Sequence, residues 1–175
     1  MLGVRATVRW FDRNLWITPL TLFIAAEVIL IPLQINSENG VLIEAISEDA
    51  RGDLYSSLSG SSSGLLGFAL AAVAILAVFS PRRTDSRAAQ IREEDLATAR
   101  VKVIGTLLTT SLMLLAVLIA STMGIALDSG KRGNAVLGNL VFCCSISAAI
   151  GLFLGGLGMG LSVLEKNRAD RGSPA

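Results

Sequence analysis

Long apolar stretches are the feature that most constrains how this chain folds. The stretches at about residues 58–79, 103–125 and 136–163 contain no charged side chain, and the one at about 15–35 contains only Glu27. A helix of about 20 mostly apolar residues crosses about 30 Å of hydrocarbon. Inside lipid, each such helix pairs its own backbone polar groups. The sequence therefore predicts an all-α membrane protein with four transmembrane helices in an up-down bundle.

The composition excludes several classes of enzyme and ligand. Charged residues make up 17% of the chain, against about 25% in an average soluble domain. The chain has no histidine, which excludes His-ligated haem, Ser-His-Asp hydrolysis and HExxH zinc sites. A formal net charge of +1 provides no basic field for nucleic acid. We therefore expect a non-enzymatic protein of the lipid bilayer, without cofactor, metal or nucleic-acid partner.

Basic residues are distributed unevenly between the apolar stretches. All but three of the 15 lysines and arginines fall in residues 1–14, in the loop between the second and third stretches, or in residues 166–175. Cytoplasmic segments carry the excess of Lys and Arg, so both termini are predicted to be cytoplasmic. Residues 1–14 then form a basic interfacial segment, residues 15–165 the transmembrane domain, and residues 166–175 a polar cytoplasmic tail.

The first loop, about residues 36–57, is then external and acidic. Its charged residues are Glu38, Glu44, Glu48, Asp49, Arg51 and Asp53. Two interpretations stay open: a surface that attracts cations or a partner, or acids that are simply tolerated outside the membrane. Apolar positions within residues 41–55 favour a short helix along the interface. On the cytoplasmic side, residues 87–102 are expected to continue as a helix into the third apolar stretch.

Glu27 is the one charged residue inside an apolar stretch, and an intramembrane acid is by default a candidate functional residue. No Lys or Arg lies at a comparable depth, so we expect its carboxyl to be protonated, or to share water or a cation. Residues at a similar level in the other predicted helices supply hydroxyl groups. These candidates for an ion or proton site are Ser61, Ser62, Ser63, Ser121, Thr122 and Ser145. The alternative is a neutral carboxyl that hydrogen-bonds to a neighbouring helix.

Small residues recur at helical spacing in the second and fourth stretches and let helix backbones approach closely. These helix-packing candidates are Gly60, Gly64, Gly67, Ser147, Gly151, Gly155, Gly156 and Gly160. They indicate tight packing, within the four-helix unit or between copies, or a seam that lines a water path. Cys143 and Cys144 are adjacent, point about 100° apart on a helix, and are expected to be unpaired apolar fillers.

The sequence of residues 55–58, followed by that of residues 63–68, resembles the second helix of small four-span bacterial inner-membrane proteins, some of which occur among prophage or antiviral-defence genes. The resemblance covers about 25 residues of low complexity. It implies a bacterial inner-membrane protein and carries no functional residue over to this chain.

Two functions from different classes remain. The first is an oligomeric channel-like or membrane-permeabilising module, suggested by Glu27, the serine-rich second helix and the glycines of the fourth. The second is an accessory or regulatory subunit of a larger membrane complex, suggested by short loops and the lack of a catalytic constellation. An intramembrane enzyme is disfavoured because no base and nucleophile are paired in the sequence.

Overall fold

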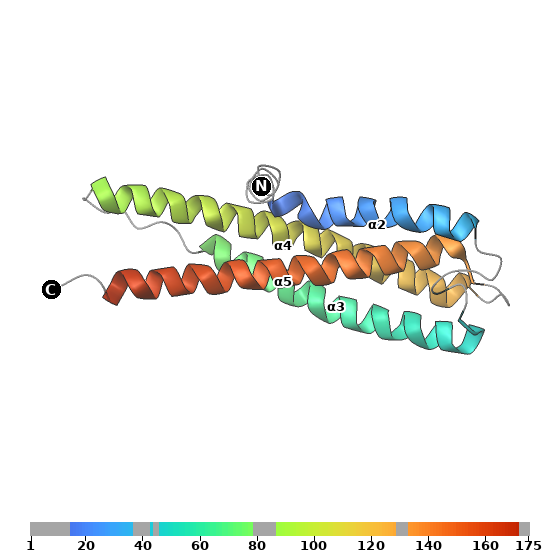
Figure 1. Cartoon of the computed structure of the whole chain (residues 1–175). Helices are drawn as coiled ribbons and strands as arrows, with labels where there is room; N and C mark the ends of the chain where they lie inside the picture. Colours follow the sequence, from blue (N-terminus) through green and yellow to red (C-terminus); the bar gives the residue numbers. More distant parts are fainter. Residues whose placement is uncertain (1–14, 37–42, 44–45, 79–86, 129–132, 172–175) are drawn as a thin grey trace.

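The regular structure of the chain is entirely helical where the computed structural model describes it, at residues 15–36, 43, 46–78, 87–128 and 133–171. A single 3-10 turn, η1 (Leu15–Ile17), leads into α2 (Thr18–Ile35), which is followed by α3 (Glu48–Val78), α4 (Arg87–Leu127) and α5 (Ala135–Arg171). The four α-helices lie along one long axis, and successive helices run in opposite directions (Figure 1). The all-helical prediction is confirmed for these residues.

Local signals explain several helix ends. Pro19 occupies the first turn of α2, where its missing N–H costs no hydrogen bond. Near the other end of α2, the backbone N–H of Asn36 donates to the Pro32 carbonyl at 3.2 Å. The Asn134 side chain accepts a hydrogen bond from the Leu137 N–H at 3.2 Å, which caps the start of α5.

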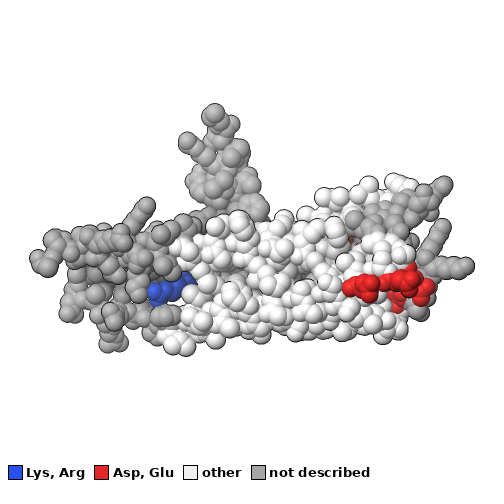
Figure 2. All heavy atoms as spheres, turned by 90° about the horizontal axis from the view of Figure 1, so that it is seen from below, with Lys and Arg blue, Asp and Glu red and all other residues white. Residues whose placement is uncertain are grey.

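Three segments are long and apolar enough to cross a membrane: Glu48–Val78, Ala97–Leu127 and Ala135–Gly160. The apolar part of α2, Thr18–Gln34, is shorter. Figure 2 shows a face on which an uncharged band separates acidic side chains, at the end where α3 begins, from basic side chains at the other end. The helices and this band have the character of a membrane protein.

Some boundaries differ from the sequence-based expectation. The prediction of a short interfacial helix within residues 41–55 is wrong for the described part of that range, because residues 48–55 are the first turns of α3. The helix extends this far because Arg51 and Tyr55 are buried against the rest of the bundle. The prediction that residues 87–102 continue into the third apolar stretch is confirmed by α4. The expected interfacial segment 1–14 lies outside the described residues.

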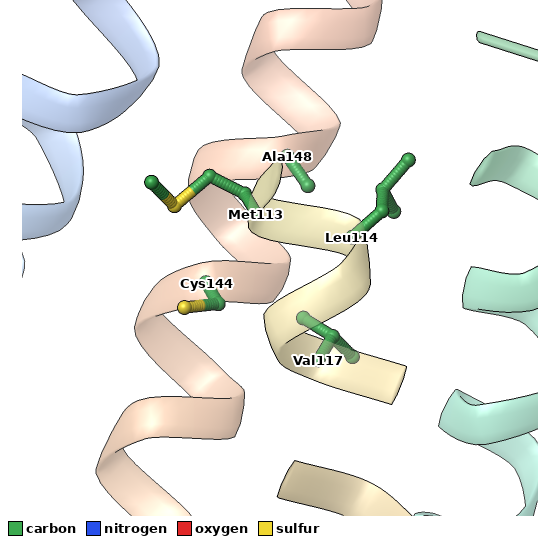
Figure 3. Close-up of a cluster of buried hydrophobic side chains, with 5 residues drawn as sticks. All are labelled: Met113, Leu114, Val117, Cys144 and Ala148. Atoms are coloured by element: carbon green, nitrogen blue, oxygen red, sulfur yellow. The ribbon is translucent and has the colours of Figure 1, made fainter. Parts of the chain in front are cut away.

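The packing is centred on α4. Helix α3 packs along α4, α4 along α5, and α5 against α2, whereas α2 and α3 share no extensive contact in the described parts. The middle of the α4–α5 contact is a cluster of buried side chains, shown in Figure 3. Its members are Met113, Leu114, Val117, Cys144 and Ala148. The middle of the α4–α5 contact is therefore apolar.

Candidate functional site

Glu27 lies on α2 and is partly buried. Cys143 and Cys144 of α5 are close enough to the Glu27 carboxyl to interact with it electrostatically. Both cysteines are unpaired and buried. The acid of α2 thus lies near the two cysteines of α5.

The predicted hydroxyl candidates do not converge on Glu27. Ser61, Ser62 and Ser145 line a cavity of about 360 Å³ between α3, α4 and α5, whereas α2 packs on α5 and α4. Ser63 is exposed, and so is Thr122.

Most of these hydroxyls are satisfied within their own helices. The Thr122 hydroxyl donates to the Leu118 carbonyl at 2.7 Å, and the Ser145 hydroxyl donates to the Val141 carbonyl at 2.7 Å. Ser121 differs, because its fully buried hydroxyl has no hydrogen-bond partner among the described residues. The six candidates therefore form no single site around the acid.

The small residues of α5 divide into two faces. The Ser147 hydroxyl donates to the Pro19 carbonyl, which fixes α2 on α5. A Cβ added to Gly151 would come within 3.0 Å of Pro19 Cγ and would collide with the Thr110 hydroxyl. A Cβ at Gly155 would lie 2.7 Å from Leu107 Cδ2. These positions are small because helices α2 and α4 approach α5 there.

The remaining glycines that the sequence singled out have open space around them. A Cβ would meet nothing within 4 Å at any of these five positions: Gly60, Gly64 and Gly67 on α3, and Gly156 and Gly160 on α5. Within the described structure these glycines have no packing partner. Two of the eight small residues thus accommodate a neighbouring helix, Ser147 makes a hydrogen bond, and five face outward.

A largely buried polar cluster, which we call the Asp128 clamp, was not predicted from the sequence. It consists of Arg51 and Tyr55 on α3, Asp128 directly after α4, and Asn134 directly before α5. Arg51 Nε lies 3.4 Å from Asp128 Oδ2, and the two side chains are 0% and 3% exposed. The Tyr55 hydroxyl donates to the same oxygen at 3.0 Å, and the Asn134 N–H donates to Oδ1 at 2.9 Å. One carboxylate therefore joins three helix ends.

Further contacts hold the clamp in place. Arg51 Nη1 donates to the Ile46 carbonyl at 2.7 Å. A Cβ at Gly124 would lie 2.8 Å from Tyr55 Cδ2 and Cε2, so a glycine is needed where the tyrosine ring crosses α4. The available sequence signals were the single tyrosine of the chain and the lone arginine of the acidic loop. Neither signal identifies Asp128 as the partner.

Two further features lie near the end of the bundle that contains the Asp128 clamp. The side-chain amides of Gln34 and Asn139 hydrogen-bond to each other at 3.1 and 2.6 Å, which joins α2 to α5. Between α3 and α5 an open groove of about 470 Å³ is lined almost entirely by apolar atoms. Its lining residues are Ile43, Ile46, Leu54, Leu58, Phe142, Ser145, Ile146 and Ala149.

The described residues contain no group of three or more His, Cys, Asp or Glu side chains that could hold a metal ion. No family model, curated protein or solved structure shows a significant match to the chain. Its function therefore has to be argued from its own geometry.

Proposed function

We propose that the chain is a non-enzymatic integral membrane protein of a bacterial inner membrane that assembles into an oligomeric, pore-like module. The observation that carries this proposal is the outer face of α3. Small residues at helical spacing form this face, and all of them are exposed. They are Ser56, Gly60, Ser63, Gly67, Ala71 and Ala74. We call this set the α3 small face.

The position of the α3 small face favours association. On α3, residues 54, 58, 62 and 65 line the cavities toward α4 and α5. At 100° per residue, residues 60 and 67 point about 180° away from residue 58. Small residues allow close helix approach in lipid, where apolar surface alone gives helices no reason to associate. A second copy of α3 is the simplest partner for such a face, because closed symmetric assemblies are the commonest oligomers.

A path for ions or solutes is more plausible between copies than within one. The apolar clusters along α4 occupy its contacts with α3 and α5, and the cavity of about 360 Å³ between α3, α4 and α5 is lined mostly by apolar side chains. The α3 small face carries the Ser56 and Ser63 hydroxyls, which would line an axis surrounded by α3 helices. Glu27 is a separate candidate, since it lies on α2, and α2 has no extensive contact with α3. Substitutions at the two places therefore distinguish two conducting paths.

The proposed membrane arrangement has four spans with both termini cytoplasmic. The 18 residues of α2 measure about 27 Å at 1.5 Å per residue, close to the 30 Å or so of a hydrocarbon core. The acidic end of the molecule in Figure 2 would face outward and the basic end inward.

The test combines oligomeric mass with ion flux. Gly60→Leu and Gly67→Leu enlarge the α3 small face, and Gly156→Leu is a matched control because that glycine also meets open space. We expect the α3 variants, but not the control, to lower the mass in detergent and the flux from proteoliposomes. Equal mass and flux in all three variants would contradict the proposed assembly. Flux that changes in Glu27→Gln but not in the α3 variants would move the conducting path to α2.

The open α3–α5 groove favours a second candidate, an accessory subunit that receives a helix of another membrane protein. Its apolar lining of about 470 Å³ resembles a helix-binding groove more than a solute site. Stable copurification of a second membrane protein in mild detergent, lost in Leu54→Ser/Ile146→Ser, would support this alternative. Purification of this chain alone would count against it.

A further inference from the structure

The proposed assembly makes no use of the space between α3 and α5. The open groove of about 470 Å³ and the cavity of about 360 Å³ share Leu58, Ser145 and Ala149 in their linings, so they are consecutive parts of one space. Helices α3 and α5 form its walls; they have no extensive contact with each other in the described parts and diverge toward the start of α3 (Figure 1). Leu114 and Val117 of α4 form its floor. We call this space the α3–α5 slot.

The described lining of the slot offers no free hydrogen-bond donor to a ligand. The groove part is lined almost entirely by apolar atoms. The polar side chains of the lining are three serines, and each hydroxyl donates to a carbonyl of its own helix: Ser61 to Leu58 at 3.2 Å, Ser62 to Ser59 at 3.1 Å and Ser145 to Val141 at 2.7 Å. A charged or strongly polar ligand would lose its hydration there without compensating hydrogen bonds. The slot therefore suits a hydrocarbon chain.

The slot is about as long as one leaflet of a bilayer is thick. Its lining residues run from 54 to 65 on α3 and from 142 to 152 on α5, which is about 15–17 Å of helix at 1.5 Å per residue. A hydrocarbon core is about 30 Å thick, so a helix that crosses the membrane would need a groove about twice as long. The length of the slot therefore favours a single acyl chain over the helix of another protein.

The position of the slot along the helices fits a chain from the leaflet at the acidic end of the molecule. The slot begins at Ile43 and Ile46, just before the acidic first turn of α3. It ends at Leu65 and Leu152, near the middle of the apolar segments of α3 and α5. Ile146 lines the slot and is exposed, so an acyl chain has access from the side.

We propose that the α3–α5 slot binds one acyl chain of a bilayer phospholipid, with the ester end near the start of α3 and the methyl end in the cavity between α3, α4 and α5. An empty slot would leave its apolar walls without contacts on one side, and water would find few polar partners there. An acyl chain supplies these contacts without burying a polar group. The inference rests on the membrane placement in the proposed function, and it does not depend on whether the protein conducts ions.

The test uses tryptophan reporters and lipids with brominated acyl chains, which quench tryptophan fluorescence only at short range. Trp10 and Trp16 are first replaced by phenylalanine, so that each variant carries a single tryptophan. Phe142→Trp reports on the groove part of the slot, and Leu152→Trp reports on the cavity part. The full chain is reconstituted in nanodiscs of phosphatidylcholine brominated either near the ester or near the methyl end. We expect the first lipid to quench Phe142→Trp more strongly and the second to quench Leu152→Trp more strongly.

Filling the slot should exclude the lipid. Ala149→Phe places a ring in the slot, because Ala149 lines both of its parts. Gly156→Phe is the matched control, since Gly156 lies two turns farther along the same face of α5, lines neither part and meets open space. We expect Ala149→Phe to remove most of the quenching of both reporters and Gly156→Phe to leave it unchanged. Phe153→Trp, at an exposed position of α5, should be quenched equally in both backgrounds.

The inference is overturned if the brominated lipids quench neither slot reporter, or if quenching does not depend on the position of the bromine. Quenching by acrylamide in place of lipid would show a slot filled with water. Quenching by neither agent would show a slot covered by protein, and a lower oligomeric mass in Ala149→Phe would identify that protein as a second copy of the chain.

The result for the slot can be separated from the test of the proposed assembly. Gly60→Leu and Gly67→Leu change the α3 small face, which lies away from the slot, so an unaltered mass in those variants would leave the slot result intact. The comparison of the two bromine positions uses no filling variant, and it therefore decides the inference even if Ala149→Phe does not fold.

Discussion

Removing either charge of the Arg51–Asp128 pair should destabilise the protein far more than removing a surface ion pair. At the observed 3.4 Å and an effective dielectric constant of about 20, the attraction between the two charges is about 5 kcal/mol. Desolvation of the two buried ions offsets much of this attraction. Loss of one partner leaves the other charge buried, and such losses cost about 3–5 kcal/mol. A pair on the surface is worth about 0–1 kcal/mol.

The structure also predicts which single substitution costs more. In Arg51→Met, the Asp128 carboxylate keeps two neutral donors, the Tyr55 hydroxyl and the Asn134 N–H. In Asp128→Asn, the fully buried guanidinium keeps its hydrogen bond to the Ile46 carbonyl but loses its ion pair with the Asp128 carboxylate. We therefore expect Arg51→Met near the lower end of that range and Asp128→Asn near the upper end. The double substitution should cost less than the sum by about 1–3 kcal/mol, because the two side chains interact directly.

The assay is equilibrium unfolding in mixed micelles, followed by helical circular dichroism at neutral pH, for the four proteins of the cycle. The unfolding must be shown to be reversible before free energies are compared. Single substitutions that each cost less than about 1 kcal/mol, with no coupling between them, would refute the buried ion pair.

Three further predictions concern packing and access. Gly151→Ala should destabilise the fold by about 1–3 kcal/mol, because the added Cβ meets Thr110 and Pro19. In Gly156→Ala the added Cβ meets nothing, so the stability should stay unchanged or rise by up to about 1 kcal/mol. The same unfolding assay compares the two variants. Asn139→Leu should cost about 1–3 kcal/mol, since Gln34 loses its paired amide, and a second substitution, Gln34→Leu, should recover part of that loss. A maleimide should label neither cysteine in the folded protein, because both are at most 2% exposed; mass spectrometry before and after denaturation tests this.

The helical content could be predicted from the sequence. The residues at which each helix begins and ends could be predicted only in part. Hydropathy locates the lipid-facing core of a helix but not polar turns that pack inward. For this reason the expectation for residues 48–55 was wrong: Arg51 and Tyr55 look like residues of a solvated loop in sequence and are buried in the structure. The apolar positions within residues 41–55 were interpreted as a separate short helix along the interface and so did not extend the second apolar stretch.

The candidate site was less accessible to sequence reasoning, since it depends on which helices are neighbours. Depth along the membrane axis can be inferred from the sequence. Depth does not tell which side of a helix meets which partner. Ser61 and Ser62 are at a suitable level but line a cavity on the α3 side. Because the sequence does not show which helix faces meet, it could not predict the pairing of Arg51 with Asp128, which are 77 positions apart in the chain.

The partnership of α2 with α5 has a consequence for biosynthesis. The hydrogen bonds between Gln34 and Asn139 connect residues 105 positions apart, and Ser147 reaches back 128 positions to Pro19. Helix α2 therefore finds its main neighbour only after α5 has been made. Until then, the face of α2 that packs on α5 stays uncovered. A chain stopped before α5 would leave that face of α2 without its partner, and quality control would meet an incomplete bundle.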